Sequence, residues 1–410
     1  MTTQTVEKPK RNLKPLWMAL AFIALFGILL LPTPETLPVA GHRALAILAF
    51  AIILWMTEAV SYAVSATMII GLIAILLGIS PSLENPEHVM GTKAALKMAL
   101  GGFSSPAVAL VAGALFIAAA MKATNLHKRV ALLILSKVGV RTGAIVAGTI
   151  GVSIILAFFV PSATARAGAI VPILLGMVAA FGLPNNSRLA ALLVITAVQS
   201  ISIWNVGIKT AAAQNMVALE FIESEFGVDV SWMEWFIYAA PFSIILSIIL
   251  YFIMMKLITP ETSVVEGGTG VIKKDLQALG KLRPEEKRLI FISITLLLLW
   301  ATEGRLHPFD TTTVTLVAVA ILLTPRIGVF NWKTVEKMIP WGTIIVFAVG
   351  ISLGVVLLQT SGAHWLSDRV FSSLGLSDMP LLATIALLAA FNIIIHLGFA
   401  SATSLASALI

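Results

Sequence analysis

The stretch that decides the fold runs from residue 142 to residue 180 and reads TGAIVAGTIGVSIILAFFVPSATARAGAIVPILLGMVAA. Arg166 is its only charged residue. A helix needs roughly 20 apolar residues to cross about 30 Å of hydrocarbon, and in a bilayer the helix is the main way to satisfy every backbone polar group. Pro161 interrupts the run because it lacks a backbone N–H and disfavours a helical residue before it. The stretch therefore predicts membrane helix that is broken near Pro161.

The rest of the chain has the same character. Its 410 residues are 59% hydrophobic and 11% charged, whereas an average soluble domain carries about 25% charged residues. No stretch alternates apolar and polar residues as the strands of a membrane barrel do. We therefore expect an all-α polytopic membrane protein. Further charge-free runs cover residues 15–34, 59–83, 98–121, 189–208, 235–255, 338–367 and 379–410.

The basic residues indicate an orientation rather than a nucleic-acid partner. The net charge is +7, but the lysines and arginines lie in polar segments between the apolar runs, and two clusters of them, at 8–14 and 256–288, set the orientation. Such clusters lie on the cytoplasmic side of a membrane. We expect a cytoplasmic N-terminus, a plasma (inner) membrane location and six spans between the two clusters. One of the six is the broken helix in 142–180, while 91–112 and 189–217 are expected to be hairpin or re-entrant segments.

Three pairs of segments repeat in the same order along the chain. LAILAFAIILWMTEA at 45–59 matches FISITLLLLWATEG at 291–304, and 113–139 parallels 350–375. IILAFFVPSATARAGA, which starts at Ile154, parallels NIIIHLGFASATSLAS, which starts at Asn392. With six spans before the second copy, the two copies have opposite orientations. Inverted repeats of this kind are typical of secondary transporters, whose substrate site lies between the copies near the middle of the bilayer.

The repeat predicts a domain organisation with broken helices and re-entrant helical hairpins. Residues 1–40 form the cytoplasmic N-terminus and a first helix, 41–258 the first repeat, 259–287 a cytoplasmic linker and 288–410 the second, inverted repeat. The second copy stops soon after its match to the Pro161 region, so we expect it to be incomplete at its C-terminal end.

The two Ser-Ala-Thr triplets, one in each copy, are the candidate substrate site. After the break at Pro161 a new half-helix begins, and its hydroxyl side chains are suited to cap the N-terminus. Free N–H groups and the positive end of the helix dipole make such a terminus attractive to anions. Two such termini would hold the two ends of a dicarboxylate. The candidate residues are Ser162, Ala163 and Thr164 in the first copy and Ser401, Ala402 and Thr403 in the second.

The chain resembles the divalent-anion:sodium symporter family, and within it the plastid 2-oxoglutarate/malate translocators and the citrate/succinate antiporters. The resemblance covers about residues 41–257 and 288–410. It implies that the triplets contact substrate carboxylates, that Asn215 belongs to the site, and that the protein is a homodimer working by an elevator motion. The segments that carry the resemblance are TEAVSYAVSATMI, GGFSSPAVAL, VPSATARAGAIVPI, TAAAQN and FASATS.

Two departures from the family pattern concern the coupling ion. The family has Ser-Asn-Thr at both turns, whereas Ala163 and Ala402 replace the asparagines here. The resemblance implies sodium as a coupling ion near Ser162 and Ser401, and the lost carboxamides weaken that expectation. Arg166 supplies a fixed positive charge instead, and a charge inside a membrane helix is usually functional. We therefore expect sodium-independent exchange of di- or tricarboxylates such as malate, succinate, 2-oxoglutarate and citrate.

Other functions stay open at this point. The first alternative is a sodium-coupled dicarboxylate or sulfate symporter, and the second is an anion channel. The sequence has no G-x-x-x-x-G-K-[ST] nucleotide loop and no H-E-x-x-H metalloprotease motif, so we expect neither an enzyme nor a bound cofactor. The expected partners are the small carboxylate anion, the lipid bilayer and a second copy of the chain.

Overall fold

The computed structural model describes residues 13–160, 162–264, 268–376, 379–399 and 405–406. All regular elements within these ranges are helices. Seven of the described helices are long and apolar enough to cross a membrane. The predicted all-α polytopic fold is therefore confirmed. The seven are α2 (Val39–Thr57), α5 (Pro106–Thr124), α7 (Thr142–Phe159), α8 (Ala163–Ala180), α9 (Arg188–Gly207), α11 (Trp232–Leu257) and α16 (Trp341–Gln359).

The chain forms two compact units. The first combines residues 1–108 with 341–410, and the second is continuous from 109 to 340. These units group residues that pack together, whereas the repeats were expected from matching sequence segments. The units therefore do not test the expected repeats at 41–258 and 288–410, which stay a prediction.

The first unit packs its helices closely through small residues. The N–H of Gly102 donates to the hydroxyl of Ser352 on α16 at 2.9 Å. A Cβ on Gly102 would lie 2.0 Å from the carbonyl oxygen of Ala348, so only glycine allows this approach. Besides α2 and α16, this unit contains α1 (Lys14–Leu30), α3 (Tyr62–Gly78), α4 (Thr92–Ala99), η1 (Gly101–Ser104), α17 (Gly362–Ser373) and α18 (Leu381–His396).

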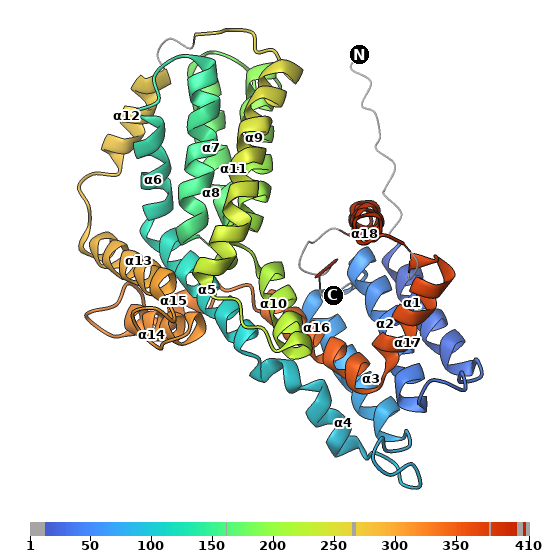
Figure 1. The fold of residues 1–410 in the computed structure, drawn as a ribbon. Helices are drawn as coiled ribbons and strands as arrows, with labels where there is room; N and C mark the ends of the chain where they lie inside the picture. Colours follow the sequence, from blue (N-terminus) through green and yellow to red (C-terminus); the bar gives the residue numbers. More distant parts are fainter. Residues whose placement is uncertain (1–12, 161, 265–267, 377–378, 400–404, 407–410) are drawn as a thin grey trace, which may run out of the picture. The chain divides into compact units, whose positions relative to one another are not determined.

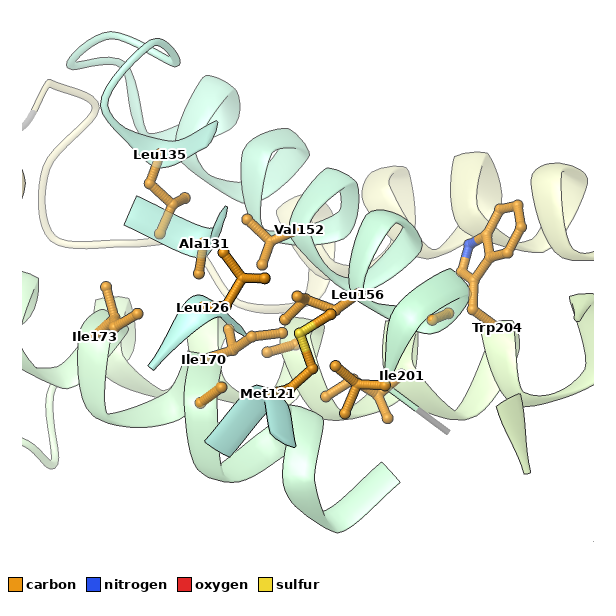
Figure 2. Close-up of a cluster of buried hydrophobic side chains, with 14 of the residues drawn as sticks. Met121, Leu126, Ala131, Leu135, Val152, Leu156, Ile170, Ile173, Ile201 and Trp204 are labelled. Carbon is orange, nitrogen blue, oxygen red and sulfur yellow. The ribbon is translucent and has the colours of Figure 1, made fainter. Parts of the chain in front are cut away.

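The second unit is built around a bundle in which α7, α8, α9 and α11 lie side by side (Figure 1). Its apolar core lies where these helices meet, and Figure 2 shows Leu156, Ile170 and Ile201 within it. The unit also contains α6 (Leu126–Leu135), η2 (Lys209–Ala211), α10 (Ala213–Phe226), α12 (Gly268–Ala278), α13 (Pro284–Thr302), α14 (Thr311–Leu323) and α15 (Trp332–Val335).

Helices α7 and α8 form a hairpin rather than one broken span. At the start of α7 the N–H of Thr142 donates to the carbonyl of Ser263 at 3.0 Å. At the start of α9 the N–H of Arg188 donates to Glu261 at 2.6 Å, and only a short turn joins α8 to α9. The beginning of α7 and the end of α8 therefore lie at the same end of the bundle. The expected single span over 142–180 is wrong, because the chain reverses direction near Pro161.

For 189–217, expected to be a hairpin or a re-entrant segment, the hairpin form is wrong and the re-entrant form stays a prediction. Most of that range is α9, one uninterrupted helix, and the break comes only after Gly207, at η2. In 91–112 the structure has the short helix α4, the turn η1 and the first part of α5.

The two copies of the Leu-Trp-x-Thr-Glu motif make matching contacts in the two units. Trp55 on α2 donates to the hydroxyl of Ser65 on α3 at 3.3 Å. Trp300 on α13 donates to the hydroxyl of Thr315 on α14 at 3.1 Å. Both indoles are buried. Each copy thus ties its helix to the next one in the same way, which supports the predicted repeat.

Candidate functional site

The tip of the α7–α8 hairpin carries the first Ser-Ala-Thr triplet. α7 ends at Phe159, and Ser162 is the N-cap of α8. The Ser162 hydroxyl accepts a hydrogen bond from the N–H of Ala165 at 3.3 Å. The predicted break and the predicted hydroxyl cap are both present. Ser162 and Ala163 are half-buried and Thr164 is exposed, so the first turn of α8 is open at its outer side.

The start of α8 differs from the start of α9 in the same bundle. At α9 both carboxylate oxygens of Glu261 accept backbone N–H groups, from Arg188 at 2.6 Å and from Leu189 at 3.0 Å. The first turn of α8 contains no acidic residue, and no carboxylate among the described residues binds its N–H groups. Helix N-termini attract negative charge. At α9 the carboxylate of Glu261 provides that charge, whereas at α8 no described carboxylate does, so the α8 N-terminus is suited to bind an anion from outside the protein. Carboxylates also bind the N-terminal N–H groups of α11, α13 and α14.

Arg166 lies one turn into α8 and is fully buried, with 0% exposure. Its Nη2 donates to the carbonyl of Ala211 at 3.1 Å and to the side-chain oxygen of Asn205. Its Nε and Nη1 have no hydrogen-bond partner among the described residues, and it forms no ion pair within them. An unpaired buried charge is strongly unfavourable. The guanidinium therefore has both the free donors and the charge to bind an anion.

Asn205 and Asn215 hold the segment that faces Arg166. The side-chain amide of Asn215 donates to the backbone carbonyls of Asn205 at 2.7 Å, Ile208 at 3.2 Å and Lys209 at 3.3 Å. Asn205 lies in the last turn of α9, where helix carbonyls lack partners, and the other two carbonyls follow that turn. The structure thus brings Asn215 close to Arg166 through Asn205, with Asn215 supporting the backbone.

Asn205 is the residue that the sequence analysis missed. It lies in the ordinary apolar stretch ISIWNVG. The one available signal was an asparagine near the end of a membrane helix, where polar residues are rare and often functional.

Lys209 provides a second cation in the same segment. It is buried at 7% exposure and its Nζ donates to the carbonyl of Val230 at 2.6 Å. It forms no ion pair with a described residue. Since η2 also provides the Ala211 carbonyl that holds Arg166, two positive charges lie on neighbouring elements of one unit.

The second triplet falls outside the described residues. These residues are Ser401, Ala402 and Thr403. Their role in the site stays a prediction.

A sodium site near Ser162 and Ser401 likewise stays a prediction. In the described part of the chain no group of three or more His, Cys, Asp or Glu side chains is placed to hold a metal ion. Sodium also binds hydroxyl and carbonyl oxygens, which that observation does not concern.

Known proteins similar to this chain are membrane transporters. The family described as the sodium:sulfate symporter transmembrane region matches residues 12–410. A membrane protein of Cupriavidus necator is 51% identical over 390 residues, which cover 95% of this chain and 76% of the relative. The citrate/succinate antiporter of Escherichia coli is 28% identical, covering 88% of this chain and 75% of the relative.

Two further relatives differ in the coupling that their names state. The L-tartrate/succinate antiporter of Escherichia coli is 29% identical over 96% of this chain and 82% of the relative. The sodium-dependent dicarboxylate transporter of Staphylococcus saprophyticus is 27% identical over 92% of this chain and 73% of the relative. With the family match running through both compact units, the chain belongs to the sodium:sulfate symporter family of multi-pass membrane transporters.

Proposed function

We propose that the protein is a secondary carrier of di- and tricarboxylate anions that exchanges one anion for another without sodium. The observation that carries this proposal is the buried Arg166, whose Nε and Nη1 lack partners among the described residues, beside the α8 terminus that no protein carboxylate occupies. Relatives named as citrate/succinate and tartrate/succinate antiporters support the substrate class.

The physical argument for exchange is the cost of an empty site. A dicarboxylate brings about two negative charges into a low-dielectric site, and burying them requires positive charge in compensation. Arg166 and the α8 N-terminus supply part of that charge permanently, with Lys209 nearby. When no anion is bound, the same cation is unpaired, so crossing the membrane empty is unfavourable. A carrier of this kind returns loaded, which means exchange.

Sodium-coupled symport is the second candidate. The Staphylococcus saprophyticus relative is named a sodium-dependent dicarboxylate transporter, and the family is described as sodium:sulfate symporters. In that mechanism co-bound sodium would supply the positive charge, and Ser162 with backbone carbonyls would supply its oxygen ligands.

Further parts of the proposal follow from the sequence and the resemblance. We assign the N-terminus to the cytoplasm, the protein to the plasma (inner) membrane, and residues 41–258 and 288–410 to two inverted repeats. We also propose that the carrier is a homodimer with an elevator-like motion, and that Ser401 and Thr403 contact the substrate.

Uptake into proteoliposomes tests the proposal. Vesicles loaded with succinate, citrate, malate or no anion are given labelled external succinate, in sodium or in choline buffer. Exchange predicts uptake only into anion-loaded vesicles, equally fast in both buffers. Saturable sodium-driven uptake into empty vesicles would establish symport instead. Uptake that internal anions do not accelerate would indicate a channel.

A further inference from the structure

A groove between α13 and α14, far along the chain from the candidate anion site, has the features of a lipid site. The cavity has a volume of about 260 Å³. Its α13 wall is one helical face that runs from Arg288 through Phe291 to Leu299, and its α14 wall includes Val317 and Ile321. Except for Arg288 and Thr295, the lining side chains are apolar. An apolar groove on a membrane protein favours hydrocarbon over a polar solute.

The exposed walls indicate that the groove faces outward from its own unit. Phe291 is 72% exposed, Val317 is 55% exposed and Ile327 is 60% exposed. From Arg288 to Leu299 the groove follows eleven residue steps of α13, which corresponds to about 16 Å of helix. The hydrocarbon of one leaflet is about 15 Å thick, half of the bilayer value. The groove therefore has the length of one lipid leaflet.

The lining residue that carries positive charge lies at one end of the groove. Arg288 lines that end, and its Nη1 donates to the carbonyl of Gly328 at 3.0 Å, which leaves its charge without an ion-pair partner among the described residues. Arg326, next to the lining residue Ile327, is exposed. Of the two acidic residues in the first turn of α13, Glu286 is held by Arg129 at 2.9 Å, and Glu285 forms no ion pair with Arg288.

We infer that the α13–α14 groove binds an anionic phospholipid. Its phosphate contacts Arg288 and Arg326, and one acyl chain lies along the face from Phe291 to Leu299. Each basic residue at the membrane surface contributes about 1 kcal/mol to the binding of an anionic headgroup. The apolar walls contact only the acyl chain and do not discriminate between headgroups. The arginines at one end of the groove therefore select an anionic headgroup. The apolar face holds the lipid by burying its acyl chain.

Native mass spectrometry of the full chain tests this inference. The protein is taken from nanodiscs that contain phosphatidylcholine and phosphatidylglycerol in equal amounts, and retained lipids are counted. We expect phosphatidylglycerol to be retained preferentially. Arg288→Gln should reduce that retention about fivefold, the equivalent of one basic contact. Val317→Trp, which fills the groove, should remove the retained lipid altogether.

Matched controls separate this site from general surface effects. Lys274→Gln removes an exposed charge on α12, and Ile248→Trp adds an indole to the exposed face of α11; both should retain lipid as the unmodified protein does. A phosphatidylglycerol with a photoreactive acyl chain should cross-link to α13 or α14 peptides.

Three results would overturn the inference. The first is equal retention of phosphatidylcholine and phosphatidylglycerol. The second is unchanged lipid counts in both Arg288→Gln and Val317→Trp. The third is a Val317→Trp variant that changes the number of protein copies while lipid retention stays the same, since a second copy would then cover the groove.

Discussion

Two arginines of the second unit are buried to a similar degree and are held in opposite ways. Arg129 on α6 is 6% exposed and Arg166 on α8 is 0% exposed. Arg129 donates to both carboxylate oxygens of Glu286, at 2.9 and 3.2 Å, and to the carbonyls of Gly280 and Leu279. Arg166 has two acceptors, Asn205 and Ala211, and no carboxylate among the described residues.

We propose that this difference separates a structural charge, Arg129, from a functional one, Arg166. Arg129 ties α6 to the first turn of α13 and to the segment before it, and its charge is neutralised within the protein. Arg166 keeps its charge for a partner that the described residues do not provide. Burial does not distinguish the two arginines, whereas the unused donors of Arg166 do.

Removing Arg129 should cause the largest loss of stability. Arg129→Ala leaves the buried Glu286 with only the longer ion pair to Arg283, at 3.8 Å, and breaking one side of a buried ion pair costs about 3–5 kcal/mol. The unfolding temperature of the purified protein should fall accordingly. The double variant Arg129→Leu/Glu286→Leu should recover most of the loss, because neither charge is then left alone. A single variant as stable as the unmodified protein would mean that the ion pair is not structural.

Replacing Arg166 should have the opposite effect on stability. Arg166→Gln removes a buried charge that has no counter-ion among the described residues, and replacing buried ions by neutral groups is often neutral or stabilising by about 1–4 kcal/mol. We expect an unfolding temperature equal to or above that of the unmodified protein in anion-free buffer. A marked decrease would show that Arg166 holds the fold together as Arg129 does.

Ser162→Ala should have an intermediate effect. The hydroxyl caps α8 through the N–H of Ala165, and loss of such a cap costs about 1 kcal/mol. If the same hydroxyl contacts the anion, the apparent affinity for succinate should fall while the amount of folded protein stays similar. Ser187→Ala, which removes the cap of α9, is the matched control and should leave that affinity unchanged. Equal affinities in both variants would assign Ser162 to capping alone.

The smallest expected effect concerns Glu261, the carboxylate that satisfies α9. Hydrogen bonds from the backbone N–H of Arg188, and then from other backbone groups, lower the pKa of Glu261 below its usual value. A lowered pKa stabilises the folded state above the unfolded-state pKa, and this contribution is lost as the pH falls through the lower folded-state value. In the Glu261→Gln variant the free energy of unfolding should therefore fall slightly less as the pH is lowered through the acid range. An identical profile would mean that solvent screens the interaction completely.

The sequence predicted the parts that depend on local patterns. The apolar runs identified the membrane helices, Pro161 marked the helix break and Ser162 the cap, because these follow from backbone chemistry within a few residues. Arg166 was recognised because a charge in a long apolar run is conspicuous.

The parts that depend on distant contacts were not predictable. A proline break is compatible with a bent span and with a reversal, and only the bonds from Thr142 to Ser263 and from Arg188 to Glu261 distinguish the two. Arg129 and Glu286 are 157 residues apart, and nothing in either local sequence pairs them. Asn205 was missed for the same reason, since its contact with Arg166 depends on how α8 packs against α9.

Counterflow by the Arg166→Gln variant tests the central claim most directly. Vesicles loaded with succinate and free of sodium are given labelled succinate, with each variant normalised to folded protein and with Arg141→Gln, an exposed arginine before α7, as the control. We expect exchange by the unmodified protein and by Arg141→Gln. For Arg166→Gln we expect a decrease of about 30-fold or more, since losing one partner of a buried charge contact costs about 2–5 kcal/mol. Exchange by Arg166→Gln at the unmodified rate would contradict the claim that Arg166 binds the transported anion.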